Sequence, residues 1–552
     1  MSARSRETPL GWRLALVIMF AALVAGAGLF SLPPLDRDES RFAQASAQML
    51  ETGDAIAIRF QHRERNKKPG GAYWLQAASV SAFSSVEARQ IWAYRIPSVI
   101  GVIFAAIFTF LAGHRLYDER TGFLAALLIA SAPVVAAEAT IAKADGVLLA
   151  LVCLAQYAFI EFYAAHKDGR RVGWAATLTF WTAHGAAILV KGPIALMISA
   201  LTGLSLAISE RRIGWAFRIR PFIGIAIILA MVAPWAWAIH NATDGRFFAD
   251  AVGGDMLGKV FEAQERHAGP PGYHAFLVWG LFWPAAALIG PGLAHLWRDR
   301  ADWRAQFLLG WIVPSWIVFE IAATKLPHYV MPLYPALAIV AAHAVLKDGR
   351  AQTTLRKLGA IVYGGIGLLF AALIVAAPKL LDSAPVASIY YAVAAAIAAA
   401  ALWIAGEFWR GRAYRGAVLA AALAGLYAWA MMALTLPRMD ALTVSPQISA
   451  ALDEADLHPI KDGGRTVALA GYSEPSAVFL IGTDTILTNG ANAGRLLTAG
   501  DVAAVAVEAR ELDDFLANAG DCIRTLAVID GLNYSNIRPV EITLYAPANC
   551  PS

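Results

Sequence analysis

Long apolar stretches separated by short polar connections run through the chain from residue 14 to residue 436. About twenty apolar residues in a row are enough to cross the hydrocarbon core of a membrane as a helix. Stretches of this kind lie at 14–32, 92–113, 121–137, 144–163, 173–190, 192–209, 221–239, 273–296, 305–323, 328–346, 358–378, 386–408 and 416–436. The pattern therefore predicts a polytopic α-helical membrane protein with about thirteen transmembrane helices.

The first stretch follows Arg4, Arg6 and Arg13, as the apolar part of a signal peptide does. The small residues after it do not form a convincing cleavage site, so we interpret it as a retained first span.

Basic residues lie in alternate connections, on the same side as the basic N-terminus. The positive-inside rule makes that side cytoplasmic, and an odd number of spans places the C-terminal segment on the opposite side. The residues concerned are Arg115, Arg120, Lys167, Arg170, Arg171, Arg211, Arg212, Arg218, Arg220, Arg298, Arg300, Arg304 and those of 347–357 and 410–415.

The pattern of apolar and polar residues changes at residue 437. Short strand-like runs such as 466–470 and 525–529 alternate with turn residues, as in a small soluble α/β domain. We therefore expect a transmembrane domain over 1–436 and an exterior α/β domain over 437–552. Cys522 and Cys550 both lie in the exterior part, where an oxidising compartment favours a disulfide between them. Cys153 lies in an apolar stretch and is interpreted as a buried thiol.

Composition narrows the function classes. The chain is 58% apolar and 16% charged, with a net charge of +4 that is spread evenly along its length. A charge so small and so dispersed argues against nucleic-acid binding. Membrane lipids are the partners that such a composition requires.

The first exterior loop, 33–90, breaks the charge rule because it carries many basic residues. A loop of this length can escape the positive-inside rule, so the charge alone does not prove a function. Within it Phe42, Ala45 and Met49 recur at helical spacing, and another apolar stretch begins at Tyr73, which predicts helices at the membrane interface. Cations held at headgroup level beside such helices suit a phosphate that carries a long lipid tail. The basic residues are Arg37, Arg41, Arg59, Arg63, Arg65, Lys67, Lys68 and Arg89.

Ionisable residues also gather at the exterior ends of the spans. Polar groups at membrane depth mark a functional site by default. We expect one polar cavity to collect Glu138, Lys143, Asp145, His184, Lys191, Glu320 and Lys325.

The motifs of the chain resemble those of the bacterial GT-C glycosyltransferases. In the first loop these are Asp38-Glu39-Ser40-Arg41-Phe42, the run 49–54, Lys68-Pro69 and Tyr73-Trp74; further on they are 189–193, 233–235 and Lys325-Leu326-Pro327-His328-Tyr329. The last motif is similar to that of the branch with the lipid A aminoarabinose transferases, which is related to the protein O-mannosyltransferases.

The resemblance implies an inverting glycosyltransferase of the bacterial inner membrane that uses a polyprenyl-phosphate-linked sugar donor at the periplasmic face. Asp38 matches the principal catalytic acid of the family, which can orient or deprotonate the acceptor hydroxyl. Asp145 matches a second exterior acid, with helix capping as the alternative role. For Glu39 a structural role is as well supported as a catalytic one.

The same resemblance implies that Arg41 and Lys68 meet the donor phosphate, where cations offset the charge on the leaving group. Lys191 and Lys325 are plausible auxiliaries. For the lysines the alternative is a side chain that extends to the membrane interface without any role in binding.

The sequence departs from the family at Lys67, where relatives carry a glutamate implied to hold a metal with a later histidine. His267 matches that histidine, but a lysine beside the site repels a divalent cation. We therefore interpret Lys67 as a further phosphate-binding cation in place of the metal, with a solvated surface lysine as the alternative. No cofactor is firmly implied.

Two other classes of membrane protein, transporters and binding proteins without activity, share some of these features with a transferase. A transporter of lipid-linked sugars predicts polar residues at the membrane midplane and repeated halves, and neither pattern is present in the sequence. A binding protein without activity would not require Asp38 and Lys68. Among acceptors, lipid A or lipopolysaccharide is favoured by the motif 325–329, and an exported protein is the alternative.

Overall fold

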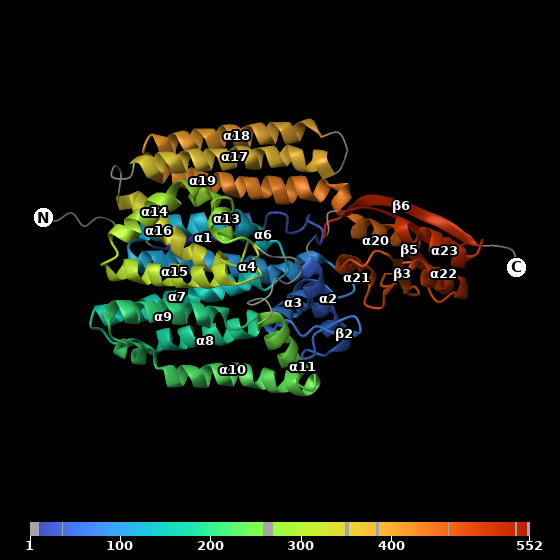
Figure 1. Cartoon of the computed structure of the whole chain (residues 1–552), viewed down its shortest axis with the longest axis horizontal. Helices are drawn as coiled ribbons and strands as arrows, with labels where there is room; N and C mark the ends of the chain where they lie inside the picture. The colour runs from blue at the N-terminus through green and yellow to red at the C-terminus, as the bar shows by residue number, and fades with distance from the viewer. Residues whose placement is uncertain are drawn as a thin grey trace.

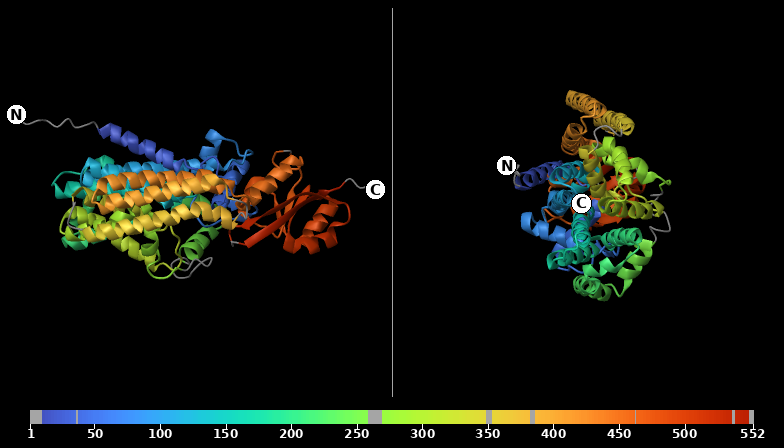
Figure 2. Two further views of the ribbon diagram at one scale, coloured as in Figure 1. Left: turned by 90° about the horizontal axis from the view of Figure 1, so that it is seen from above. Right: turned by 90° about the vertical axis from the view of Figure 1, so that its left-hand side faces the viewer.

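The computed structural model describes residues 10–35, 37–257, 269–347, 353–381, 386–461, 463–535 and 538–548. Helices of the N-terminal four fifths of the chain lie side by side in one bundle (Figure 1). A sheet with its own helices extends beyond one end of the bundle, as the perpendicular views confirm (Figure 2).

The bundle helices are apolar almost all round, which is the pattern of helices that meet either other helices or lipid. Their bounds are α1 (Leu10–Ala25), α4 (Ile91–Leu116), α5 (Glu119–Ala130), α6 (Pro133–Ala139), α7 (Asp145–Lys167), α8 (Trp174–Lys191), α9 (Ile194–Glu210), α10 (Pro221–Ala242), α13 (Tyr273–Leu281), α14 (Ala286–Arg298), α15 (Trp303–Ile321), α16 (Tyr334–Lys347), α17 (Thr353–Leu381), α18 (Ser388–Trp409) and α19 (Ala413–Trp429).

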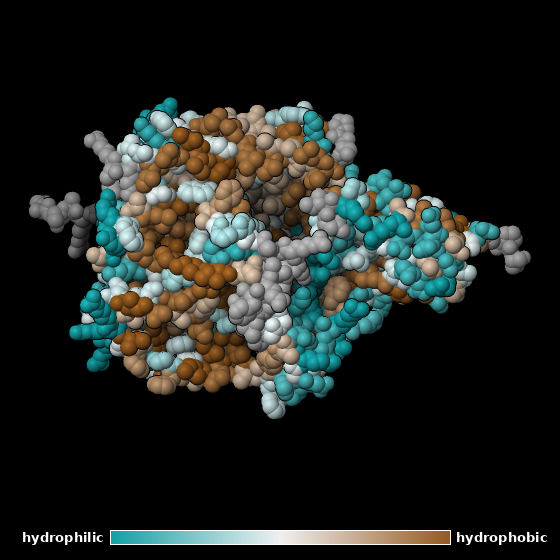
Figure 3. Space-filling view, in the orientation of Figure 1, coloured by the Kyte–Doolittle hydropathy of each residue, from teal (hydrophilic) through white to brown (hydrophobic). Residues whose placement is uncertain are grey.

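The outer surface of the bundle is apolar as well. A hydrophobic belt covers its side, and hydrophilic residues lie at its ends and over the sheet (Figure 3). Large side chains such as Leu229 and Trp237 of α10 are exposed in this belt. A surface of this kind needs lipid, which identifies the chain as a multi-pass membrane protein.

Each of the thirteen predicted apolar segments falls on a helix or on a bent pair of helices. Within the described residues six helices are long and apolar enough to cross a membrane, or up to eight if each bent pair is one span. The bent pairs are α5 with α6 and α13 with α14, and α1, α9 and α16 lie in shorter apolar segments. The number of thirteen crossings therefore stays a prediction.

Close packing of α4 on α7 fixes the helix ends near the first loop. A Cβ atom on Gly101 of α4 would lie 2.5 Å from the backbone oxygen of Gly146 in α7. Only glycine allows this approach. This close approach of the two helices brings the first turn of α7, which contains Asp145, against α4.

The first exterior loop folds into α2 (Arg37–Thr52), the short strands β1 (Arg59–Phe60) and β2 (Arg63–Glu64), and α3 (Gly71–Phe83). The rings of Phe42 in α2 and Tyr73 in α3 stack with 4.8 Å between their centres. The helical spacing expected from Phe42, Ala45 and Met49 is present, and these three side chains are buried.

The chain after residue 443 forms a mixed five-stranded sheet in the order β4-β3-β5-β7-β6. β3 pairs in parallel with β4 and β5, while β7 pairs antiparallel with β5 and β6. We call this part the sheet domain; its elements are α20 (Val444–Glu454), β3 (Val467–Ala470), α21 (Pro475–Ile481), β4 (Ile486–Thr488), α22 (Gly490–Ala499), β5 (Ala504–Glu508), α23 (Leu512–Ala519), β6 (Ile523–Asn533) and β7 (Arg538–Pro547).

The predicted runs 466–470 and 525–529 lie in β3 and β6. Cys153 is buried and free, and Cys522 is disulfide-bonded. Cys550 lies outside the described residues, so its pairing with Cys522 stays a prediction, as does the domain boundary at residue 437.

Candidate active site

Asp38 lies in the first turn of α2 with half of its side chain exposed. Its Oδ1 atom is 3.4 Å from Nη1 of Arg41 and 3.5 Å from Nη2 of Arg65. Partial burial acts to raise the pKa of Asp38, but the positive charges of Arg65, Lys143 and Arg41 outweigh it, so the pKa lies below its ordinary value. The carboxylate is thus ionised at neutral pH and accessible to a ligand.

Arg65 is held in place by aromatic packing. Its guanidinium lies over the ring of Phe42, 5.6 Å from the ring centre, and only 10% of its side chain is exposed. Because Phe42 stacks on Tyr73, one aromatic pair joins α2, α3 and the cation beside Asp38. Arg65 is one of the eight basic residues of the first loop, and no motif in the sequence marks it as part of this site.

Glu39 points away from Asp38 into the protein and is almost fully buried. Arg95 of α4 binds both of its oxygens, at 2.7 and 2.9 Å, and the backbone N–H of Ala142 donates to Oε1 at 2.8 Å. Arg95 also donates to the carbonyl of Leu32 at 2.6 Å. These contacts anchor the start of α2 on the bundle. They favour the structural role for Glu39 over the catalytic one.

Asp145 lies in the first turn of α7 and belongs to a group of five ionisable residues, which we call the inner charged cluster. Its Oδ1 atom contacts the Lys191 ammonium and lies 3.7 Å from Nε2 of His328. The other imidazole nitrogen, Nδ1, is 3.3 Å from Oε1 of Glu138, and Lys143 lies 3.4 Å from the same oxygen. The cluster thus consists of two carboxylates, two lysines and an imidazole between the carboxylates, and all five side chains are mostly buried.

The remaining predicted cations differ in how far their side chains are exposed to solvent. Lys67 is exposed and Lys68 half-buried in the turn that leads to α3. Lys325 is 8% exposed, and its ammonium donates to the carbonyl of Gly269 at 3.0 Å. The structure therefore brings Lys191 directly to Asp145, and it places Lys325 in the chain segment that also delivers His328.

His184 does not reach the inner charged cluster. It is fully buried within α8, where its ring nitrogens lie 2.7 Å from the carbonyl of Phe180 and 2.9 Å from the hydroxyl of Ser199. A position two turns before Lys191 on the same helix lies about 10 Å further from the helix end. His184 thus links α8 to α9.

A metal centre does not emerge from the described residues. No group of three or more His, Cys, Asp or Glu side chains there is placed to hold an ion. His267 lies outside the described residues, and Lys67 is a cation where the implied ligand would be acidic. His274 of α13 is buried and lies 2.6 Å from Glu320 of α15, a pair that no local pattern predicts because the two residues are 46 positions apart. No step of the chemistry is therefore assigned to a metal.

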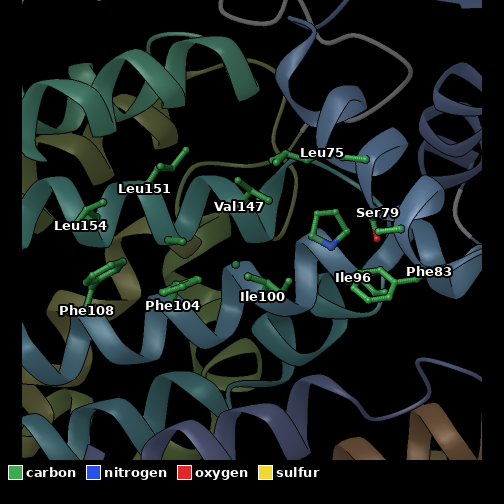
Figure 4. Close-up of a pocket in the computed structure, with 15 residues that line it drawn as sticks. Leu75, Ser79, Phe83, Ile96, Ile100, Phe104, Phe108, Val147, Leu151 and Leu154 are labelled. Atoms are coloured by element: carbon green, nitrogen blue, oxygen red, sulfur yellow. The ribbon is translucent and has the colours of Figure 1, made fainter. Parts of the chain in front are cut away.

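An apolar groove of about 520 Å³ opens on the side of the bundle between α3, α4 and α7 (Figure 4). The side chains of Phe83, Ile100 and Phe104 on its walls are exposed to the lipid-facing side. One of its lining residues is Val147, two positions after Asp145 in α7. The lining also includes Leu75, Ser79, Ile96, Phe108, Leu151 and Leu154.

Helix α7 carries both an apolar, lipid-exposed groove and a charged residue of the inner cluster, a geometry suited to an amphiphile. The structure of ArnT from Cupriavidus metallidurans bound to undecaprenyl phosphate matches with a TM-score of 0.76 over 97% of this chain and 98% of that chain, at 19% identity. ArnT from the same organism in the apo state matches with a TM-score of 0.73 at 20% identity. At this identity the likeness shows the fold alone.

Sequence comparison agrees with that fold. Residues 67–237 match the family model described as dolichyl-phosphate-mannose-protein mannosyltransferase. The chain is 28% identical over 368 residues to the undecaprenyl phosphate-alpha-4-amino-4-deoxy-L-arabinose arabinosyl transferase of Pseudomonas paraeruginosa, with 63% of this chain and 62% of the relative aligned. The protein of the same name from Aeromonas hydrophila is 29% identical over 374 residues, with 65% and 64% aligned. The alignments span less than two thirds of the length of these relatives, and they confirm the resemblance to ArnT-like GT-C proteins.

Proposed function

We propose that this chain is an inverting glycosyltransferase that moves a sugar from a polyprenyl-phosphate carrier to an acceptor at the periplasmic face of the bacterial inner membrane. The observation that carries the proposal is that α7 contributes to both parts of the site: Val147 lines the apolar groove, and Asp145, two positions earlier, belongs to the inner charged cluster. A carrier lipid needs a dry surface for its tail and cations for its phosphate, within a few ångströms of each other. The names of the aligned relatives and the ligand of the similar ArnT structure support a carrier of this type.

In this proposal the tail lies in the groove and the phosphate lies among the cations around Asp145. Lys191 at the end of α8 and Lys325 after α15 are mostly buried, while Arg41, Lys68 and Lys67 belong to the first loop. As the glycosidic bond breaks, negative charge grows on the departing phosphate oxygen, and fixed cations stabilise it. Partial burial strengthens this effect because less water screens the charges.

Asp38 serves the acceptor side. The acceptor oxygen forms a bond to the anomeric carbon while the bond from that carbon to the phosphate oxygen breaks, and the hydroxyl proton passes to the Asp38 carboxylate. An ionised, accessible carboxylate can orient the hydroxyl before transfer and take its proton during transfer. Asp145, by contrast, already holds Lys191 and His328, so we assign it the support of the phosphate-binding cations.

We propose lipid A as the acceptor, because the aligned relatives are named for 4-amino-4-deoxy-L-arabinose transfer and the motif 325–329 resembles the lipid A branch. A protein acceptor is the second candidate, because the matching family model is named for protein mannosylation. The proposed topology has thirteen spans, a cytoplasmic N-terminus and a periplasmic sheet domain. A disulfide at Cys522 suits the oxidising side of the membrane.

Mass spectrometry of cells that express the chain tests the proposal. Intact lipid A and exported proteins are analysed from one culture with the wild-type chain and one with Asp38→Asn. We expect a new sugar mass on lipid A in the wild-type culture only. A new mass on proteins instead would establish the second candidate, and identical spectra in both cultures for both acceptors would contradict a transferase.

A further inference from the structure

The helix that carries Asp38 is held by the sheet domain, and this inference rests on the proposed function. α2 lies beside α21, between the bundle and the sheet domain (Figure 1). At the first residue of α2, Arg37 lies 3.4 Å from Oε2 of Glu474, which is 4% exposed. Ser535 donates to the same Glu474 oxygen at 2.8 Å. A buried carboxylate of the sheet domain therefore contacts the neighbour of Asp38 in the chain.

The other end of α2 is bound through Thr483, which follows α21. Its hydroxyl accepts a hydrogen bond from Nε2 of Gln44 at 2.7 Å and donates one to Oε2 of Glu51 at 2.7 Å. Gln44 and Glu51 are seven positions apart and thus share one face of the helix, two turns from each other. Gln44 is fully buried, so its amide depends on these partners.

Two strained residues complete the contact. Gln61 and Arg89 have φ values of +55° and +47°, which are uncommon for residues other than glycine. Gln61 donates to the carbonyls of Thr483 at 3.1 Å and Thr485 at 2.6 Å. Arg89 donates to Oε1 of Gln44 at 3.1 Å and binds Glu51. Strained conformations persist where the surrounding contacts determine them.

We infer that Glu474 and Thr483 are positioning residues for Asp38. The Glu39–Arg95 pair fixes the start of α2 to the bundle, and the apolar face of the helix packs on α3 and around Ala144 and Val190. Apolar packing is non-directional, so polar contacts decide the exact rotation of the helix. Among the described residues, Asp38 pairs with Arg41 and Arg65 at 3.4 and 3.5 Å, and ion pairs of this length do not hold a partly exposed side chain firmly. Contacts from the sheet domain at both ends of the 16-residue helix remove the remaining freedom. A small rotation of α2 would move the carboxylate relative to the reacting carbon, and such misplacement slows a reaction strongly.

Thr483→Val tests the inference, because it removes the hydroxyl at nearly constant volume. The full-length chain is purified in lipid nanodiscs and supplied with undecaprenyl phosphate-α-4-amino-4-deoxy-L-arabinose and lipid A. We expect kcat to fall about tenfold, KM for the donor to stay within about twofold, and amide hydrogen exchange to quicken over 37–52. Thr483→Ser keeps the hydroxyl and recovers most of kcat. Asp484→Asn, at an exposed position of the same turn, is the matched control and leaves all three quantities unchanged.

The variants Arg37→Gln and Glu474→Gln, made singly and together, test whether this ion pair holds the N-terminal end of α2. If the pair positions α2, the double variant loses less activity than the product of the two single losses. The inference is wrong if Thr483→Val lowers only the melting temperature and leaves kcat and exchange over 37–52 unchanged. If the wild-type chain transfers no sugar at all, the proposed function fails, and unchanged exchange in Thr483→Val would then reject the positioning role separately.

Discussion

The two acidic regions of the site differ in how they are held. Asp38 is exposed and meets its arginines at 3.4 and 3.5 Å, whereas Asp145 is buried against Lys191 and His328. An exposed carboxylate can exchange its cationic partners for a substrate. A buried carboxylate cannot do so without leaving buried charges, its own and those of its cations, without a partner. The comparison teaches that two acids with similar places in the sequence pattern differ in accessibility, and this difference is why we propose Asp38 for the chemistry and Asp145 for support of the cations.

Loss of the open carboxylate should have the largest effect. Asp38→Asn keeps the size of the side chain but cannot accept a proton, so we expect kcat to fall by about 10² to 10⁴-fold. Binding of undecaprenyl phosphate, measured by intrinsic tryptophan fluorescence, should change little because the cations remain. A variant with normal kcat would place the chemistry elsewhere.

The neighbouring acid should affect stability instead of the chemical step. Glu39→Gln leaves the Arg95 guanidinium buried without its anion, and breaking a buried pair costs about 3–5 kcal/mol. The melting temperature of the purified chain should therefore drop far more than for Asp38→Asn. Equal melting temperatures would show that Glu39 is not the anchor.

A change to Arg65 should shift the pH dependence of transfer. Because the nearby cations hold the pKa of Asp38 below its ordinary value, the wild-type carboxylate stays ionised to a lower pH than an ordinary aspartate does. Arg65→Gln removes one cation, so the pKa rises and activity is lost at a higher pH as the solution is acidified. Stability linked to this carboxylate follows the same sign: it is present at neutral pH and lost on acidification. An unchanged acid limb of the kcat profile would contradict the assignment of Asp38.

Blocking the groove should have the smallest effect on the chemical step. Ala78 lies on its α3 wall and is exposed, so Ala78→Trp fills the groove without disturbing the core. We expect KM for a full-length polyprenyl donor to rise about tenfold with kcat unchanged, since lost tail contacts weaken binding only. A donor with a single isoprene unit is the control, and its KM should not move.

Periodicity predicted the helical segments, and four of the ionisable residues expected in one cavity, Glu138, Lys143, Asp145 and Lys191, do lie together. The sequence patterns did not reveal that Glu39 turns inward, because its partner Arg95 is 56 positions away and only packing of α2 on α4 brings them together. His328 was inside a recognised motif, yet its contacts with Glu138 and Asp145 depend on three separate elements. Local sequence patterns predict where helices form. Pairings between residues that are distant in sequence depend on tertiary packing, which local patterns do not show.

The central claim is that the groove and Asp38 together handle a polyprenyl-phosphate sugar. The most direct measurement is the release of undecaprenyl phosphate from undecaprenyl phosphate-α-4-amino-4-deoxy-L-arabinose by the purified chain with lipid A, followed by mass spectrometry together with the mass of lipid A. The account predicts equal amounts of free carrier and sugar-modified lipid A with the wild-type chain, and almost none with Asp38→Asn. Intact donor after prolonged incubation with the wild-type chain, or equal release by both chains, would contradict it.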